Sequence, residues 1–106
     1  MVLGVDPGAK TGLVVLDCLG PRPGVAHRIA VGSDDLANAV RLLCSTFSPD
    51  VLAIELPSQV FAHGRGAKSM GARVGIERSL LAARDVAGVI KGIVGTLCPA
   101  VRVFEE

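Results

Sequence analysis

The chain has 106 residues and a formal net charge of +1, with 50% hydrophobic and 20% charged residues. This composition excludes a disordered chain, and the low net charge excludes a histone-like polycation. Three Phe and no Tyr or Trp also exclude the aromatic platforms on which RNA-recognition and OB domains stack bases. We therefore expect one small domain, residues 1–106, with an aliphatic core.

The first third of the chain predicts three strands. Apolar runs cover residues 2–5 and 11–17, and the Pro-Gly-Ala-Lys stretch between them is typical of a hairpin turn. A second cluster of glycine and proline, at residues 20–24, precedes a third apolar run at residues 25–31. Because its alternation is only partial, we expect this third run to form an edge strand.

A helix is predicted for residues 33–47. Ser33 offers an N-cap hydroxyl, and Asp34 and Asp35 place negative charge in the first turn, where the helix dipole favours it. One apolar face follows at helical spacing: Leu36, Val40, Leu43 and Phe47. The Ser48-Pro49 pair is expected to end the helix.

The second half predicts a strand, a long helix and a last strand. Residues 51–54 are wholly apolar, which is typical of a parallel strand covered on both faces. After a loop at residues 56–68, apolar residues recur at helical spacing as far as Leu97, with interruptions expected near three glycines. Residues 101–104 follow as a strand. The fold class is therefore α/β, a mixed five-stranded sheet with an antiparallel hairpin meander, parallel strands and flanking helices.

Two carboxylates end two of the predicted strands. Asp6 closes the first apolar run and Glu55 closes the run at 51–54. If the helix at 33–47 returns the chain so that these strands are parallel neighbours, both side chains reach the same edge of the sheet. Such a pair repels unless a cation lies between its members, and carboxylate oxygens suit Mg²⁺ or Mn²⁺. Singly, each acid is also typical of a solvated turn, which is how we interpret Asp17.

The turn from Asp6 to Gly12 allows a different interpretation. A glycine-containing strand–turn–strand loop that carries Lys10 can hold a phosphate with its backbone amides. The loop lacks the G-x-x-x-x-G-K pattern of a Walker motif and no helix follows it. A nucleotide-binding lobe of the actin and sugar-kinase type therefore stays open as an alternative.

Three motifs follow one another along the chain: the run Val2–Leu13, then Ala53-Ile54-Glu55 with Val60-Phe61 after it, and Met70-Gly-Ala-Arg-Val-Gly75. In order and spacing they resemble the RuvC-type Holliday junction resolvases of the ribonuclease H-like superfamily, and the third matches that family's Leu-Gly-x-x-x-Gly helix start. The likeness runs from residue 2 to about residue 104. It implies a ribonuclease H-like fold and a homodimer that cuts four-way DNA junctions symmetrically.

The resemblance also implies roles for single residues. Asp6 and Glu55 correspond to the first two Mg²⁺ ligands of a four-acid catalytic site, and Phe61 to the aromatic at the junction centre. Residues 56–58 are an insertion relative to the family pattern. The family's other two acids lie on a helix after the strand matched by 101–104, so we expect the chain to lack this C-terminal part. Glu105 and Glu106 end the strand and are not expected to replace those acids.

Basic residues gather after Glu55. Between Phe61 and Arg84 there are five Lys or Arg against one acid, whereas the first sixty residues have four against six. A solvated helix face would explain this, but so would contacts with a phosphate backbone close to the predicted carboxylates. The DNA-binding residues we expect are Phe61, Arg65, Lys68 and Arg73.

The cysteines and the termini bear on the compartment. Cys18, Cys44 and Cys98 lie far apart, so we expect buried hydrophobic thiols in a reducing compartment rather than disulfides or a zinc site. The N-terminus lacks the basic region of a signal peptide, and no apolar run is long enough to span a membrane. We therefore expect a cytoplasmic protein without a membrane partner.

The sequence thus favours a magnesium-dependent, structure-selective DNA endonuclease that hydrolyses phosphodiesters in four-way junctions. Two alternatives stay open: the nucleotide-binding lobe, and a relative that binds branched DNA without cutting it. Glu55 and the basic stretch after it distinguish the nuclease, because a nucleotide-binding lobe requires neither.

Overall fold

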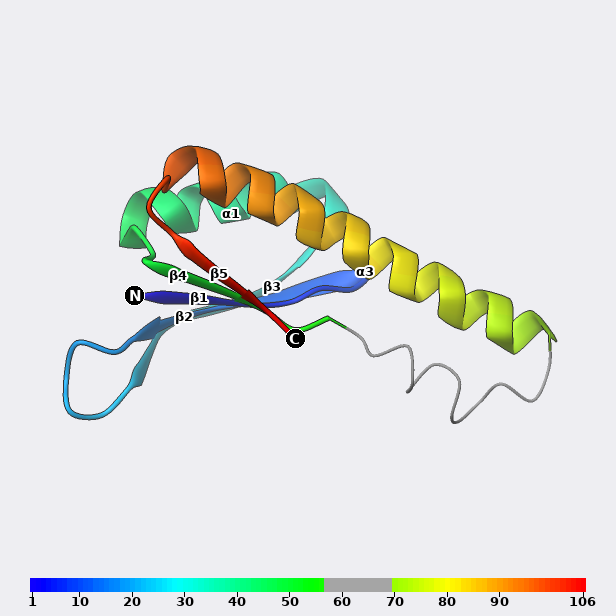
Figure 1. The fold of residues 1–106 in the computed structure, drawn as a ribbon, viewed down its shortest axis with the longest axis horizontal. Coiled ribbons are helices and arrows are strands. Elements are labelled where there is room, and N and C mark those ends of the chain that lie inside the picture. Colours follow the sequence, from blue (N-terminus) through cyan, green and yellow to red (C-terminus); the bar gives the residue numbers. More distant parts are fainter. Residues whose placement is uncertain (57–69) are drawn as a thin grey trace.

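The computed structural model describes residues 1–56 and 70–106, and within 70–81 it describes the backbone alone. In this part of the chain, five strands and two helices follow one another (Figure 1). They are β1 (Val2–Asp6), β2 (Lys10–Asp17), β3 (Gly24–Gly32), α1 (Ser33–Phe47), β4 (Val51–Ile54), α3 (Met70–Leu97) and β5 (Arg102–Glu105). Their order confirms the element order predicted from the sequence.

The strands form one mixed sheet in the order β3-β2-β1-β4-β5. The pairs β1–β2 and β2–β3 are antiparallel, and the pairs β1–β4 and β4–β5 are parallel. The meander and the parallel half are those expected from the sequence, and β3 is indeed an edge strand. The strand after α1 lies beside β1, so the carboxyl ends of β1 and β4 meet at one edge.

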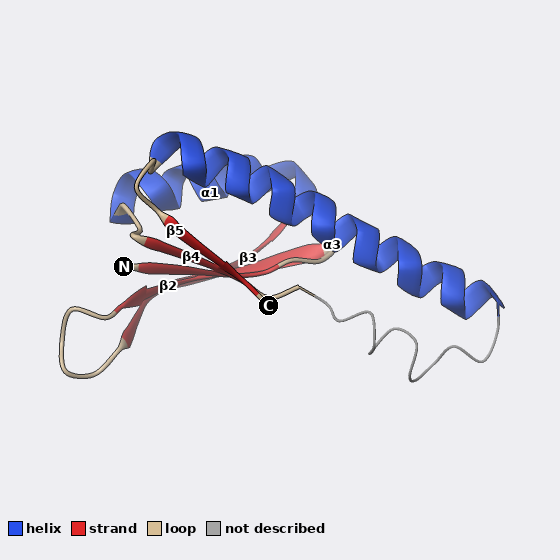
Figure 2. Ribbon diagram, viewed as in Figure 1, coloured by secondary structure: helices blue, strands red, loops and turns tan. Residues whose placement is uncertain are grey.

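The two helices cover the same face of this sheet and pack against each other (Figure 2). Every second strand residue points into the layer between sheet and helices, as the period of two in a strand requires. Leu3, Leu13 and Leu52 are fully or almost fully buried there, as are Val40 of α1 and Ile90 of α3. This aliphatic layer is the hydrophobic core.

The intervening strand residues lie on the opposite face, which the described helices leave open. In β4, Leu52 and Ile54 are buried, whereas Val51 and Ala53 are half-buried. The expectation that residues 51–54 are covered on both faces is therefore wrong within the described chain. On the open face, Val51 and Ala53 have no second layer of described residues over them.

The end of α1 agrees with the prediction, whereas its N-cap and the continuity of α3 differ from it. Ser48 has a left-handed conformation (φ 46°), and its N–H donates to the carbonyl of Cys44 at 2.9 Å, which closes α1 before Pro49. The cap of α1 is Gly32 rather than Ser33, and it makes no side-chain capping hydrogen bond. Helix α3 runs without a break to Leu97, so glycines 88, 92 and 95 do not interrupt it, and its buried residues Ile90 and Val94 pack in the core.

The cysteines differ from the expectation at one position. Cys44 is buried in the core and Cys98 is half-buried, but Cys18 is exposed beyond the end of β2. Asp17, beside it, accepts a hydrogen bond on Oδ1 from the backbone N–H of Leu19 at 3.0 Å, as expected of a turn acid. None of the helices in the described residues has an apolar stretch that would reach across a bilayer.

Candidate functional site

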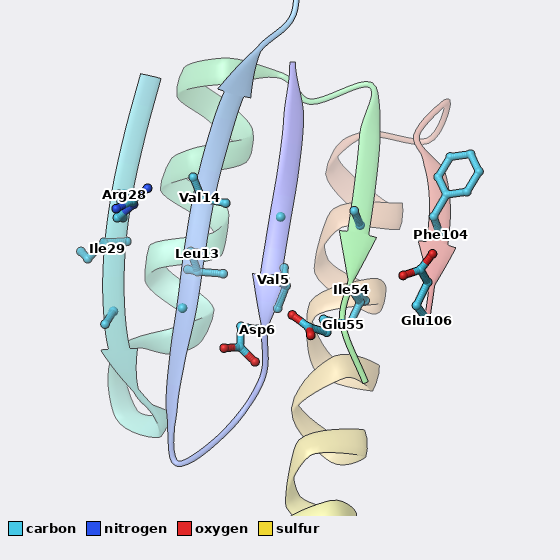
Figure 3. A pocket seen from close by; sticks show the side chains of 14 residues that line it. Val5, Asp6, Leu13, Val14, Arg28, Ile29, Ile54, Glu55, Phe104 and Glu106 are labelled. Atoms are coloured by element: carbon cyan, nitrogen blue, oxygen red, sulfur yellow. The ribbon is translucent and has the colours of Figure 1, made fainter. Parts of the chain in front are cut away.

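Asp6 and Glu55 are neighbours at the carboxyl ends of β1 and β4 (Figure 3). Val5 pairs with Ile54 in the parallel register, and the N–H of Glu55 donates to the carbonyl of Val5 at 3.0 Å. The ladder therefore continues one residue beyond β4 and sets Glu55 beside Asp6, one strand spacing of about 4.8 Å away. Both side chains are exposed. The expected juxtaposition of the two acids is present in the fold.

The local sequence explains why Asp6 projects from the sheet edge. Pro7 and Gly8 turn the chain directly after it, and the hydroxyl of Thr11 donates to the carbonyl of Gly8 at 3.4 Å across this turn. On the returning strand Gly12 pairs with Asp6, and a Cβ at Gly12 would lie 3.6 Å from the Asp6 Cβ. A side chain larger than alanine at this position would therefore press against the carboxylate.

A third acid, which the sequence analysis did not place at the site, lies on the far side of Glu55. The N–H of Glu106 donates to the carbonyl of Ile54 at 3.1 Å, and its own carbonyl accepts from the N–H of Leu56 at 2.6 Å. These bonds extend the pairing of β4 and β5 past both strands, so that Glu106 lies next to Glu55. The position of Glu106 depends on the register between β4 and β5. This register cannot be inferred from the residue types of two short strands.

The three acids stand at one end of a groove on the open face, with a volume of about 950 Å³ (Figure 3). Its floor includes Val14 and four residues with little or no side chain: Gly4, Gly12, Ala30 and Ala53. Arg28 of β3 and Phe104 of β5 line opposite sides of the groove, and Phe104 is 58% exposed. Neither Arg28 nor Phe104 was among the expected site residues. Both come from edge strands, whose facing depends on register.

None of the four expected DNA-binding residues has a side chain within the described part of the structure. Phe61, Arg65 and Lys68 lie outside the described residues. Arg73 lies on α3, in the part where only the backbone is described. Their proposed contacts with DNA stay predictions.

The donor set at the strand ends fits a hard divalent cation. Mg²⁺ is commonly held by one or two carboxylates, with water and substrate phosphate completing its octahedron. Asp6 and Glu55 supply two carboxylates that are solvent-accessible on adjacent strands. Within the described residues, no group of three or more His, Cys, Asp or Glu side chains is placed to hold a metal ion. The acids thus form an open half-site rather than a closed cage.

Comparison with known proteins identifies the fold. No family model and no curated protein matches the chain. Among solved structures, RuvC of Thermus thermophilus in complex with a Holliday junction substrate matches 99% of the chain with a TM-score of 0.65 at 18% identity. A second structure of Thermus thermophilus RuvC gives 0.52 over 99% at 18% identity. The chain has the fold of the RuvC-type resolvases.

A viral resolvase supports the same conclusion. The fowlpox virus resolvase, solved with its Holliday junction DNA, matches the whole chain with a TM-score of 0.60 at 14% identity. The chain covers 60–62% of the length of these three structures. The resemblance to RuvC-type resolvases inferred from the sequence is therefore confirmed at the level of the fold, and the mixed five-stranded sheet is the one these proteins share.

Proposed function

We propose that the chain is the nuclease domain of a magnesium-dependent DNA endonuclease that resolves four-way junctions. The observation that carries this is the pair Asp6 and Glu55, set side by side at the carboxyl ends of two parallel strands of a resolvase-like sheet. Two structural neighbours were solved with Holliday junctions, which favours branched DNA as the partner. In this proposal, residues 1–106 form a single domain.

Each part of the site has a distinct task in this proposal. Asp6 and Glu55 would hold Mg²⁺, or Mn²⁺ in its place, and the bound cation would activate a water and neutralise charge on the cleaved phosphodiester. By positioning the cation, the two carboxylates would determine where the scissile phosphate binds. The groove lies on the face of the sheet opposite α1 and α3, and a DNA strand would approach the two carboxylates from this side. The residues proposed to grip DNA around the site are Phe61, Arg65, Lys68 and Arg73.

A homodimer and a reducing compartment complete the proposal. A four-way junction is close to twofold symmetric, so paired cuts require two copies of the site related by a twofold axis.

The thiols of Cys18, Cys44 and Cys98 are all free in the structure. This state is typical of the cytoplasm, which we keep as the expected location.

A cleavage assay with a matched pair of variants tests this function. The substrates are a synthetic four-way junction, a linear duplex of the same sequence and an RNA–DNA hybrid, each with Mg²⁺ or with EDTA. We expect paired nicks in the junction alone and only with Mg²⁺. Asp6→Asn removes a ligand charge and should lower the rate by more than the roughly 10- to 100-fold that loss of an outer-shell partner costs. Asp17→Asn makes the same change at a turn on another strand and should leave the rate unchanged.

Other outcomes decide between the alternatives. Junction cleavage by Asp6→Asn at the wild-type rate would contradict the assignment of the site. Junction binding without cleavage by the wild-type chain would favour the relative that binds without cutting. Stabilisation against heat by ATP with Mg²⁺, together with no binding of any DNA, would favour the nucleotide-binding lobe.

A further inference from the structure

Among the described residues that line the groove, Arg28 is the one cation. The others are three acids and small or apolar residues. Arg28 is exposed, and among the described residues it makes no salt bridge; the ion pairs found there join Met1 to Asp50 and Lys91 to Glu105. A guanidinium that faces a groove and has no ion-pair partner among the described residues is available to an anion from outside.

The sheet register fixes where Arg28 lies relative to the acids. Arg28 pairs with Val14, which pairs with Gly4, so these three form one row across the open face. Asp6 lies on the next row of the same face, paired with Gly12, which in turn pairs with Ala30. Two strand spacings and two residues along the strand separate the backbones of Arg28 and Asp6, a distance of roughly 12 Å.

The floor between them is low in the row of Asp6 and rises at Val14 in the row of Arg28. Gly12 and Ala30 carry little or no side chain, whereas the Val14 side chain lies over Gly4, where an added Cβ would be 2.8 Å from Val14 Cγ1. A strand of DNA laid on this floor would bring successive phosphates past both positions, because each strand carries one phosphate for about every 3.4 Å of helix axis. By charge complementarity, a cation held by the acids would contact one phosphate, and Arg28 would contact another.

We propose that Arg28 binds a phosphate of the cleaved DNA strand, within about three nucleotides of the scissile phosphate, and so sets the path of that strand across the sheet. This rests on the proposed nuclease function and deepens it: the groove, in addition to the basic segment after Glu55, becomes part of the DNA-binding surface. Arg28 is a substrate-positioning residue on a strand, held at a fixed distance from the acids by the ladder of β1, β2 and β3.

Binding measurements in EDTA test this without any need for cleavage. Affinity for the four-way junction is measured over a series of salt concentrations for wild type, Arg28→Gln, Arg28→Lys and Arg41→Gln. Arg41 is exposed on α1, on the helical side of the sheet, and provides the matched loss of charge. Arg28→Gln should weaken binding by roughly tenfold and lower the slope of log affinity against log salt by about one, as loss of one phosphate contact does.

The control variants separate charge from geometry. Arg28→Lys keeps the charge and loses the planar fork, so its salt slope should stay at the wild-type value while its affinity falls between the two. Arg41→Gln should bind as the wild type does. Because Arg28 is exposed, thermal unfolding of Arg28→Gln should match the wild type, which guards against a folding defect.

A scan with neutral phosphates locates the contact. Single methylphosphonates replace, one at a time, the three phosphates on either side of the scissile one. At one position, the methylphosphonate should lower the affinity of the wild type as much as the Arg28→Gln substitution does. The same methylphosphonate should not lower the affinity of Arg28→Gln any further. If wild type binds the junction and Arg28→Gln binds it equally well, the role of Arg28 is overturned while the nuclease proposal stands. If wild type binds no DNA, both fail together.

Discussion

The two faces of the sheet are built from the same strands but follow opposite rules. The covered face carries large aliphatic side chains such as Leu3, Leu13 and Leu52, sealed by α1 and α3. The open face carries glycine, alanine and Val14 in the middle, with charged and aromatic residues at its margins. Because side chains alternate along a strand, one segment supplies the core through one face and the groove through the other. Substitutions on the two faces should therefore differ in their effect on stability.

The largest difference between the faces should appear on truncation of one side chain from each. Leu52 is fully buried, so Leu52→Ala should lower the free energy of unfolding by about 2–5 kcal/mol through lost burial and a residual cavity. Phe104 loses more atoms on truncation but is 58% exposed, and Phe104→Ala should cost less than about 1 kcal/mol. Urea unfolding measures both. A loss at Phe104 as large as that at Leu52 would show that the open face is packed in solution.

A medium effect is expected where the open face is itself tightly packed. A Cβ added at Gly4 would lie 2.8 Å from Val14 Cγ1, a stiff β-branched side chain. Gly4→Ala should therefore cost about 1–3 kcal/mol of unfolding free energy, and Val14→Ala in the same chain should recover most of it. Gly12→Ala is the matched control, since its Cβ would lie in ordinary contact at 3.6 Å from Asp6 Cβ. Equal losses in both glycine variants would contradict this explanation.

The smallest effect concerns the thiol on the covered side. Burial, with a further contribution from the neighbouring Cys98, raises the pKa of Cys44 from 9.0 to about 11. Above pH 9 the unfolded chain loses this proton while the folded chain keeps it, so the stabilisation is complete below pH 9 and is lost as the pH rises through 11. Urea unfolding between pH 8 and 11 should show a steeper decline for wild type than for Cys44→Ala. Parallel declines would contradict it.

Thiol labelling offers a direct check on the same contrast. Exposed Cys18 should react with an alkylating reagent at pH 8 long before buried Cys44, whose raised pKa leaves it protonated. Mass spectrometry of partly labelled protein identifies which cysteine reacted first.

Much of the fold and the central pair of the site could be predicted from the sequence. Short apolar runs bounded by glycine, proline or acidic residues located the strands, and apolar residues at a spacing of three and four located the helices, because burial of one helix face imposes a period of 3.6. Asp6 and Glu55 could be paired because each lies at the carboxyl end of a strand, and parallel neighbouring strands bring their carboxyl ends to one edge. That inference needs only the order of the elements.

The edges of the site were decided by tertiary structure alone. A bulge between Val15 and Leu16 shifts the pairing with β3, so that Val25 and Arg28, three residues apart, both pair with residues of the open face. Such an irregularity breaks the alternation from which facing is read in a sequence. Glu106 likewise joins the acids only through the register of β4 with β5. The sequence by itself determined which segments are strands and which acids end them; only the hydrogen-bonded register decided which side chains share a face, because register is set between strands and not within one.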